Sequence, residues 1–176
     1  MVLANEQGRG AVEQTLVRLW RYAPVLLWIA FIFSASGSGL SFSNTSRVVR
    51  PLMLWLFPGI SEETMYIVHY LVRKAAHFAE YGLLALLLAR AFLTSSRPTL
   101  RHHWFIISFL VVAVFALLDE FRQSFVSSRI GTIYDSLIDM LGGAAALTVI
   151  LLWRNFRKGR KQRAASEASI HRRSAQ

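Results

Sequence analysis

The residues best suited to chemistry in this sequence are ionisable side chains at the ends of apolar runs. Lys74, His77 and Tyr81 recur at helical spacing, with Glu80 beside them, directly before one such run. An imidazole with a neighbouring carboxylate is a candidate acid–base pair, and an ammonium group is a candidate ligand for an anion. The segment therefore predicts a polar site on a helix that is otherwise apolar.

Two further apolar runs carry carboxylates at one end. Asp119 and Glu120 close the first of these runs, and Gln123 follows one helical turn later. Asp135 and Asp139, one turn apart, open the second run. Carboxylates suit proton transfer or the binding of a hard divalent cation. Three separate segments therefore offer groups for one shared site.

These segments belong to a strongly apolar chain. Of its 176 residues, 54% are hydrophobic and 17% are charged, with a mean hydropathy of +0.39, whereas soluble domains carry about 25% charged residues. Apolar stretches cover about residues 22–40, 73–93, 104–121 and 136–153, each close to the ~20 residues of a transmembrane helix. The first stretch has an alternative interpretation as a cleaved signal peptide, but three more stretches follow it. We predict an all-α membrane protein with four transmembrane helices.

The sequence divides into a membrane domain and two flanking segments. We expect a cytoplasmic N-terminal segment at 1–21, a four-helix membrane domain at 22–153 and a basic cytoplasmic tail at 154–176 that is disordered at its end. Between the first two spans, residues 43–57 mix apolar side chains with arginines, which predicts an interfacial or re-entrant segment on the outer surface. Ser61 then has the features of a helix N-cap, with Glu62 and Glu63 in the first turn.

The net charge of +10 admits two explanations, a nucleic-acid binder or a membrane protein with basic cytoplasmic loops. With four spans, the N-terminal segment, the second loop and the tail share one side, which holds 14 of the 20 Lys and Arg residues. Such a bias marks the cytoplasmic side of a membrane protein. We therefore expect both termini in the cytoplasm, the lipid bilayer as a partner and no nucleic acid. The absence of cysteine excludes disulfides and thiolate ligands.

The lengths of the apolar runs place the ionisable groups inside the membrane. Only nine residues without formal charge follow Glu80 before the next arginine, so a span of ~20 residues must take in Lys74, His77 and Glu80. Along a helix, Asp119 lies about 24 Å from His103, and Asp139 lies about 22 Å from Arg154. His103 and Arg154 mark the basic ends of these helices. Both distances fall short of the ~30 Å hydrocarbon core. Three helices therefore bring acidic groups to a similar level in the outer part of the bilayer.

This convergence predicts a ligand-binding site near the outer surface. Its basic members, Lys74, Arg122 and Arg129, suit an anionic head group or a pyrophosphate. A structural network of ion pairs is the alternative interpretation. The predicted ligand-binding residues are Lys74, His77, Glu80, Tyr81, Asp119, Glu120, Gln123, Arg129, Asp135 and Asp139.

Three spaced motifs resemble the VanZ-like family of membrane proteins. Residues 72–81 (VRKAAHFAEY) are similar to the family's K-x-x-H-F-x-E-Y pattern, residues 119–129 to D-E-x-x-Q-x-F-V-x-x-R, and residues 135–142 to D-x-x-x-D-x-x-G. Segments near 33–41 and 56–63 extend the resemblance, which covers about residues 24–153. Two departures stand out: Ser127-Ser128 replaces a frequent Pro-Gly, and Arg122 replaces a frequent histidine.

The resemblance implies a multi-pass protein of the bacterial cytoplasmic membrane. The founding member of the family is associated with resistance to the glycopeptide teicoplanin. We interpret the chain as a non-enzymatic envelope protein that binds a cell-wall precursor or a glycopeptide at the outer face.

Two alternatives stay open. In the first, a membrane enzyme acts on a lipid-linked envelope substrate, and its candidate catalytic residues are His77, Glu80, Asp119, Glu120 and Asp139. His77 with Glu80, or Glu120 with Asp139, then serve as acid and base, and the four carboxylates are the ligands available to a divalent metal. In the second, the protein is a small transporter or proton relay. Because no nucleophile, P-loop or HExxH motif is present, we predict no cofactor and no metal. The sequence assigns no oligomeric state.

Overall fold

Six helices make up the part of the chain that the structure describes, residues 2–35, 42–125 and 133–174 of a computed structural model. In chain order they are α1 (Val2–Ala35), α2 (Phe42–Leu56), α3 (Glu62–Leu93), α4 (Pro98–His102), α5 (Trp104–Gln123) and α6 (Ile133–Ser174). The described residues contain no strand. The all-α prediction is confirmed.

Four of these helices are long and apolar enough to cross a membrane, as the sequence predicted. The qualifying segments are Thr15–Ser34 in α1, Glu62–Leu93, Trp104–Gln123 and Tyr134–Ala164 in α6. We expected the first span to start at residue 22, and the segment in the structure begins earlier, at Thr15. The expected end of that span, at 36–40, lies outside the described residues.

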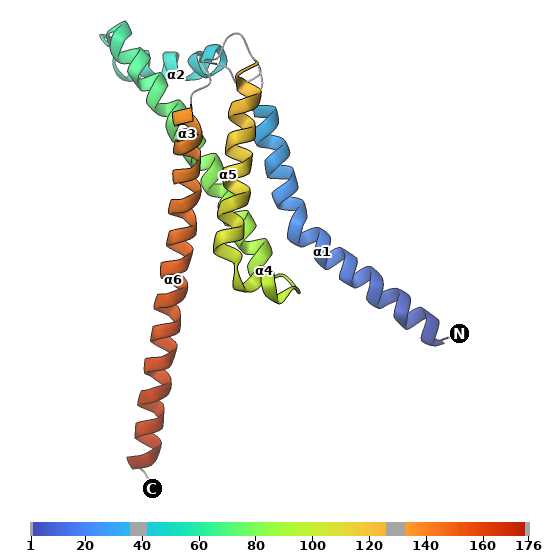
Figure 1. Cartoon of the computed structure of the whole chain (residues 1–176). Helices are drawn as coiled ribbons and strands as arrows, with labels where there is room; N and C mark the ends of the chain where they lie inside the picture. The colour runs from blue at the N-terminus through green and yellow to red at the C-terminus, as the bar shows by residue number, and fades with distance from the viewer. Residues whose placement is uncertain (1, 36–41, 126–132, 175–176) are drawn as a thin grey trace.

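The spans form a bundle around α3. Figure 1 shows α5 and α6 side by side, α3 slanting across them, and α1 leaning away toward the N-terminus. α3 packs most extensively against α6, while α5 contacts both and α1 contacts α3. The core between them is built from small and aliphatic side chains such as Leu84, Ala85, Val112, Ala116 and Leu147, all fully buried.

Glycine and small residues let α6 approach α3 and α5 closely. A Cβ atom at Gly142 would overlap the backbone carbonyl of Phe78 on α3, and a Cβ at Gly143 would lie 2.7 Å from Cγ1 of Val112 on α5. Gly82 faces the Gly142 carbonyl in turn. Glycine at 142 and 143 therefore permits close packing of α6 against its neighbours.

α3 begins where the sequence placed its N-cap. The Ser61 side chain accepts a hydrogen bond from the backbone N–H of Thr64 at 3.2 Å, and Glu62 and Glu63 occupy the first turn. The helix then continues without a break for 32 residues, which is about 48 Å. This length exceeds the ~30 Å hydrocarbon core, so α3 either tilts in the membrane or extends beyond the core.

The segment between the first two spans is one helix, α2, set across the upper end of the bundle in Figure 1 rather than along it. Arg50 on α2 forms an ion pair with Glu62 on α3, with N–O distances of 2.5 and 3.1 Å. The crosswise helix agrees with an interfacial position for residues 43–57.

The C-terminal tail continues the last span, since α6 extends to Ser174. The disorder that we predicted at the end of residues 154–176 stays a prediction. Arginine and lysine are good helix formers, and cation–π contacts such as Arg160 over Phe156, at 5.9 Å, support the extension.

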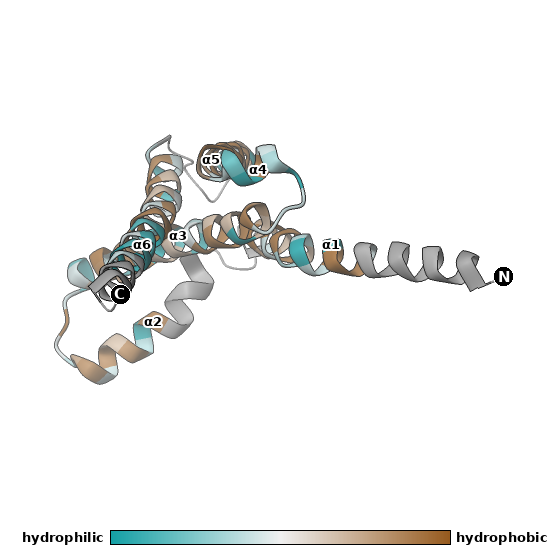
Figure 2. Cartoon of the chain, turned by 90° about the horizontal axis from the view of Figure 1, so that it is seen from below, coloured by the Kyte–Doolittle hydropathy of each residue, from teal (hydrophilic) through white to brown (hydrophobic). Residues whose placement is uncertain are grey.

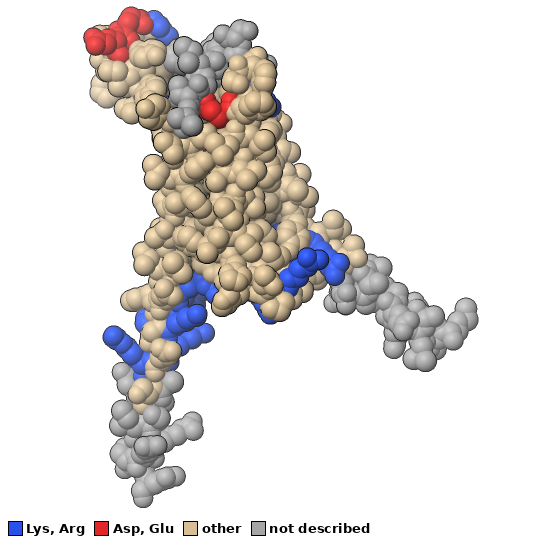
Figure 3. Space-filling model, viewed as in Figure 1, with Lys and Arg blue, Asp and Glu red and all other residues tan. Residues whose placement is uncertain are grey.

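Hydrophobic and charged residues separate along the bundle. Figure 2 shows apolar residues along α1, α3 and α5, and hydrophilic residues on the part of α6 nearest the viewer. In Figure 3 the middle of the visible face carries no charged side chain, basic groups gather below it and acidic groups lie above it. Such a band fits a helix bundle in a bilayer.

Candidate functional site

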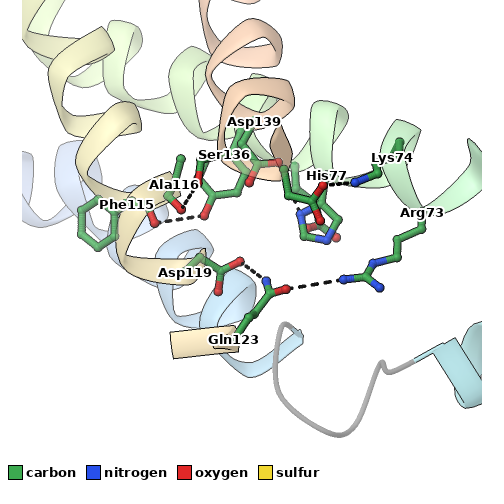
Figure 4. Close-up of polar contacts among 12 residues, drawn as sticks. Arg73, Lys74, His77, Phe115, Ala116, Asp119, Gln123, Ser136 and Asp139 are labelled. Carbon is green, nitrogen blue, oxygen red and sulfur yellow. Dashed lines mark hydrogen bonds and ion pairs between the residues drawn. The ribbon is translucent and has the colours of Figure 1, made fainter. Parts of the chain in front are cut away.

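Ionisable side chains from three helices meet near the end of α5 and the start of α6 (Figure 4). His77 comes from α3, Asp119 from α5 and Asp139 from α6. One nitrogen or oxygen atom from each of the three lies within 4.8 Å of the corresponding atoms of the other two. The structure thus brings together three residues that are 62 positions apart from first to last.

His77 and Asp139 form a polar contact between α3 and α6. Nδ1 of His77 lies 3.3 Å from Oδ1 of Asp139, and the two side chains are 13% and 3% exposed. At such burial the charge of Asp139 needs a compensating partner. Gly142 lies almost one turn after Asp139 and allows the close approach of α6 to α3 that makes this contact possible.

Asp119 is held in place by its own helix. Nε2 of Gln123 donates a hydrogen bond to Oδ2 of Asp119 at 2.8 Å, and Oε1 of Gln123 accepts one from Arg73 at 3.4 Å. Nη2 of Arg122 lies 3.7 Å from the other oxygen, Oδ1. Both Asp119 and Gln123 are almost completely buried. The carboxylate is therefore oriented by an amide on one side and faces a guanidinium on the other.

Lys74 and Asp135 form a second ion pair between α3 and α6. Their side chains are 16% and 13% exposed. The Lys74 ammonium also lies 5.0 Å from the ring centroid of Tyr70. The pair fixes the start of α6 against α3, one turn above the contact of His77 with Asp139.

Two hydrogen bonds tie the helices together next to these charges. The hydroxyl group of Tyr81 donates to the carbonyl of Phe115 at 3.2 Å, and that of Ser136 donates to the carbonyl of Ala116 at 3.3 Å. Both acceptors belong to α5. Tyr81, which we predicted to bind a ligand, is fully buried and makes a contact that holds α3 to α5.

Of the remaining predicted residues, Glu80 lies almost one turn after His77 on α3, and Glu120 is next to Asp119 on α5. The side chains of Glu80 and Glu120 are half-buried, and the backbone carbonyl of Glu80 accepts a hydrogen bond from Trp28 at 2.9 Å. Arg129 lies outside the described residues. His77 forms an ion pair with Asp139 of α6, whereas we named Glu80 as its acid–base partner from the sequence.

Arg73 and Ser136 belong to the site but were not among the residues predicted for it. Helical spacing offered a signal for both, because Arg73 precedes His77 by one turn and Ser136 precedes Asp139 by almost one turn. Arg122, which we named as a cation at this level, contacts Asp119 and also lies 5.1 Å from the ring centroid of Phe33.

An apolar groove of about 770 Å³ lies nearby, between the end of α2 and the start of α3. Its lining includes Met53, Phe57, Ile60 and Val68. None of the ionisable residues described above lines this groove, so the polar centre is a separate feature.

The helices and the polar centre define a class of protein, a multi-pass membrane protein with ionisable groups inside its bundle. The model of the VanZ/LLP1 family matches residues 19–154, and the chain belongs to this family. The match takes in part or all of each of the four spans and every residue of the polar centre. No curated protein and no solved structure matches the chain significantly.

Proposed function

We propose that this VanZ/LLP1 family protein resides in the bacterial cytoplasmic membrane, with both termini in the cytoplasm, and binds the polar part of a cell-envelope ligand at its outer face. The observation that carries the proposal is the convergence of buried ionisable side chains from α3, α5 and α6 at one end of the bundle. Such groups are costly within a membrane and usually serve a function.

The distribution of charge supports this orientation. The basic side chains of the second loop and of α6 lie at the end of the bundle opposite the polar centre. Because cytoplasmic segments of membrane proteins are enriched in Lys and Arg, the polar centre belongs on the outer side. Cell-wall precursors and glycopeptides are encountered on that side.

The cations of the centre favour an anionic ligand. Arg73, Lys74 and Arg122 lie around the carboxylates, and Arg122 keeps 39% of its side chain exposed. Guanidinium groups bind phosphate oxygens in a bidentate manner. A pyrophosphate-linked lipid precursor of the cell wall offers the matching oxygens, and a role in glycopeptide resistance follows if such a precursor is bound.

Direct binding tests the proposal. The purified protein is placed in nanodiscs, and its affinity for an undecaprenyl-type lipid pyrophosphate is measured. We expect Arg73→Gln and Arg122→Gln each to weaken binding about tenfold, since a hydrogen bond to a charged group contributes about 1.5 kcal/mol or more. Arg50→Gln is the matched control, because Arg50 is an exposed arginine that pairs with Glu62 on α3. Equal affinity for all three variants and the wild type would contradict the proposal.

A cellular test addresses the resistance role. His77→Ala, Glu80→Gln and Asp119→Asn are expressed in bacteria, and glycopeptide susceptibility is scored with the amount of protein in the membrane. We expect His77→Ala and Asp119→Asn to raise susceptibility at unchanged abundance. An unchanged phenotype for all three at normal abundance would remove the functional role of the centre.

The contact between His77 and Asp139 favours a second candidate, an enzyme that acts on the same lipid-linked ligand. An imidazole held by a buried carboxylate is suited to general acid–base catalysis. Incubation of the protein with a lipid pyrophosphate, followed by measurement of released phosphate, distinguishes an enzyme from a binding protein.

A further inference from the structure

We infer that His77, Asp119 and Asp139 form a binding site for a divalent transition-metal ion, with one ligand each from α3, α5 and α6. The sequence led us to predict no metal, because the available carboxylates matched no metal-binding motif. The structure adds an imidazole to two of those carboxylates and leaves Glu80 and Glu120 out of the set. The inference does not depend on which envelope ligand the protein binds.

The geometry is close to that of a coordination sphere. Metal–ligand bonds of about 2.0–2.2 Å place neighbouring ligand atoms of a tetrahedral site about 3.4 Å apart. Nδ1 of His77 and Oδ1 of Asp139 are 3.3 Å apart, and all three ligand atoms lie within 4.8 Å of one another.

The charges at this point favour a cation. Asp119 and Asp139 are 1% and 2% exposed and face each other across the centre. Two carboxylates at such a distance repel each other strongly in a medium of low dielectric constant. Of the surrounding cations, Arg122 lies 3.7 Å from Asp119, and Lys74 is paired with Asp135. A divalent ion between Asp119 and Asp139 compensates both charges.

A second observation points to the same atoms. Nδ1 of His77 and Oδ1 of Asp139 are both buried, and within the described residues neither makes a hydrogen bond of acceptable geometry, although they face each other. Buried polar atoms in this state call for an explanation, and a bound ion is one. On Asp119, Gln123 already holds Oδ2. Hydrogen bonds of this kind orient the carboxylate ligands of metal sites.

The donor set selects the kind of ion. One imidazole nitrogen with two carboxylates suits Zn²⁺ or Mn²⁺, whereas Ca²⁺ prefers six to eight oxygen ligands. Three protein ligands leave at least one coordination position open, as in catalytic zinc sites. That position is suited to a water molecule or to a phosphate oxygen of the anionic ligand proposed above.

Metal binding by the purified full-length protein tests the inference. The protein in detergent is stripped with a chelator, titrated separately with Zn²⁺ and Mn²⁺ by calorimetry, and analysed for metal content by mass spectrometry. We expect one ion per chain for the wild type and at least a tenfold loss of affinity in His77→Ala, Asp119→Asn and Asp139→Asn. Gln123→Ala is expected to weaken binding about tenfold through loss of the carboxylate orientation.

Two controls make the result specific. Asp135→Asn removes a largely buried carboxylate one turn from Asp139 and is expected to retain the ion. His102 and His103 are adjacent histidines on the loop side of the bundle, away from the polar centre. Their replacement tests whether Zn²⁺ binds there instead, and we expect the variant to retain the ion. Circular dichroism checks that each variant is folded. A folded wild type that binds neither ion, or loss of binding only in the His102 and His103 variant, would overturn the inference.

Discussion

Nδ1 of His77 lies 3.3 Å from Oδ1 of Asp139, and this contact links α3 to α6 where the bundle is most polar. The two residues belong to separate spans, so the contact constrains how the helices rotate against each other. Its burial makes it sensitive to the loss of one partner, because the other is then left uncompensated.

The first prediction concerns this pair as a source of stability. We expect His77→Phe and Asp139→Leu each to lower the free energy of unfolding, while the double variant loses less than the sum of the two. The coupling energy should lie at about 1–3 kcal/mol in the presence of a chelator. The measurement is unfolding in mixed micelles followed by circular dichroism. Additive losses would show that the two side chains act independently.

The second prediction concerns the helix contact at Gly142. A larger side chain there must push α6 away from the Phe78 carbonyl, so Gly142→Val should lower the free energy of unfolding by about 1–3 kcal/mol or more. Gly159→Ala is the control on the same helix, because no atom lies within 4 Å of the place that its Cβ would occupy. Alanine there should be neutral or slightly stabilising. The same micelle unfolding experiment compares the two, and equal stability would contradict the packing argument.

Much of the fold is predictable because its signals are local. The four apolar runs match the spans, the Ser61 cap starts α3, and Gly142 with Gly143 marks the close helix contact. The length of α6 is less predictable. Composition led us to predict disorder at the end of the tail, which stays a prediction, while the helix propensity of its basic residues favours the helix that continues to Ser174.

The site was predictable as a set of residues but not as a set of contacts. Hydrogen bonding of Gln123 to Asp119 follows from their spacing of one helical turn. The partner of His77 cannot be predicted from spacing. Glu80 is the neighbour on its own helix, and Asp139 is brought near only by packing of α6 against α3. Sequence spacing also gives no reason to choose Asp119 over the adjacent Glu120 as the more deeply buried carboxylate.

The third prediction concerns the ion pair of Lys74 and Asp135. Lys74→Asp places two carboxylates together, and Asp135→Lys places two ammonium groups together, so each single variant should lower the thermal midpoint. The double variant restores opposite charges across the same helix contact and should recover much of the loss. The measurement is thermal unfolding of the detergent-solubilised protein at low salt. A double variant less stable than both single variants would show that the pair is not replaceable by charge alone.

The fourth prediction concerns topology, on which the outer-face proposal depends. Because the chain contains no cysteine, single cysteines report their own accessibility. Gly59, in the exposed turn before α3, and Ser96, in the exposed turn after it, lie at opposite ends of the same span. A membrane-impermeant thiol reagent should label Gly59→Cys in intact cells and Ser96→Cys only after permeabilisation, since the basic second loop is expected in the cytoplasm. The reverse pattern would place the polar centre on the cytoplasmic side and contradict binding at the outer face. A cell-wall precursor would then have to bind before its export.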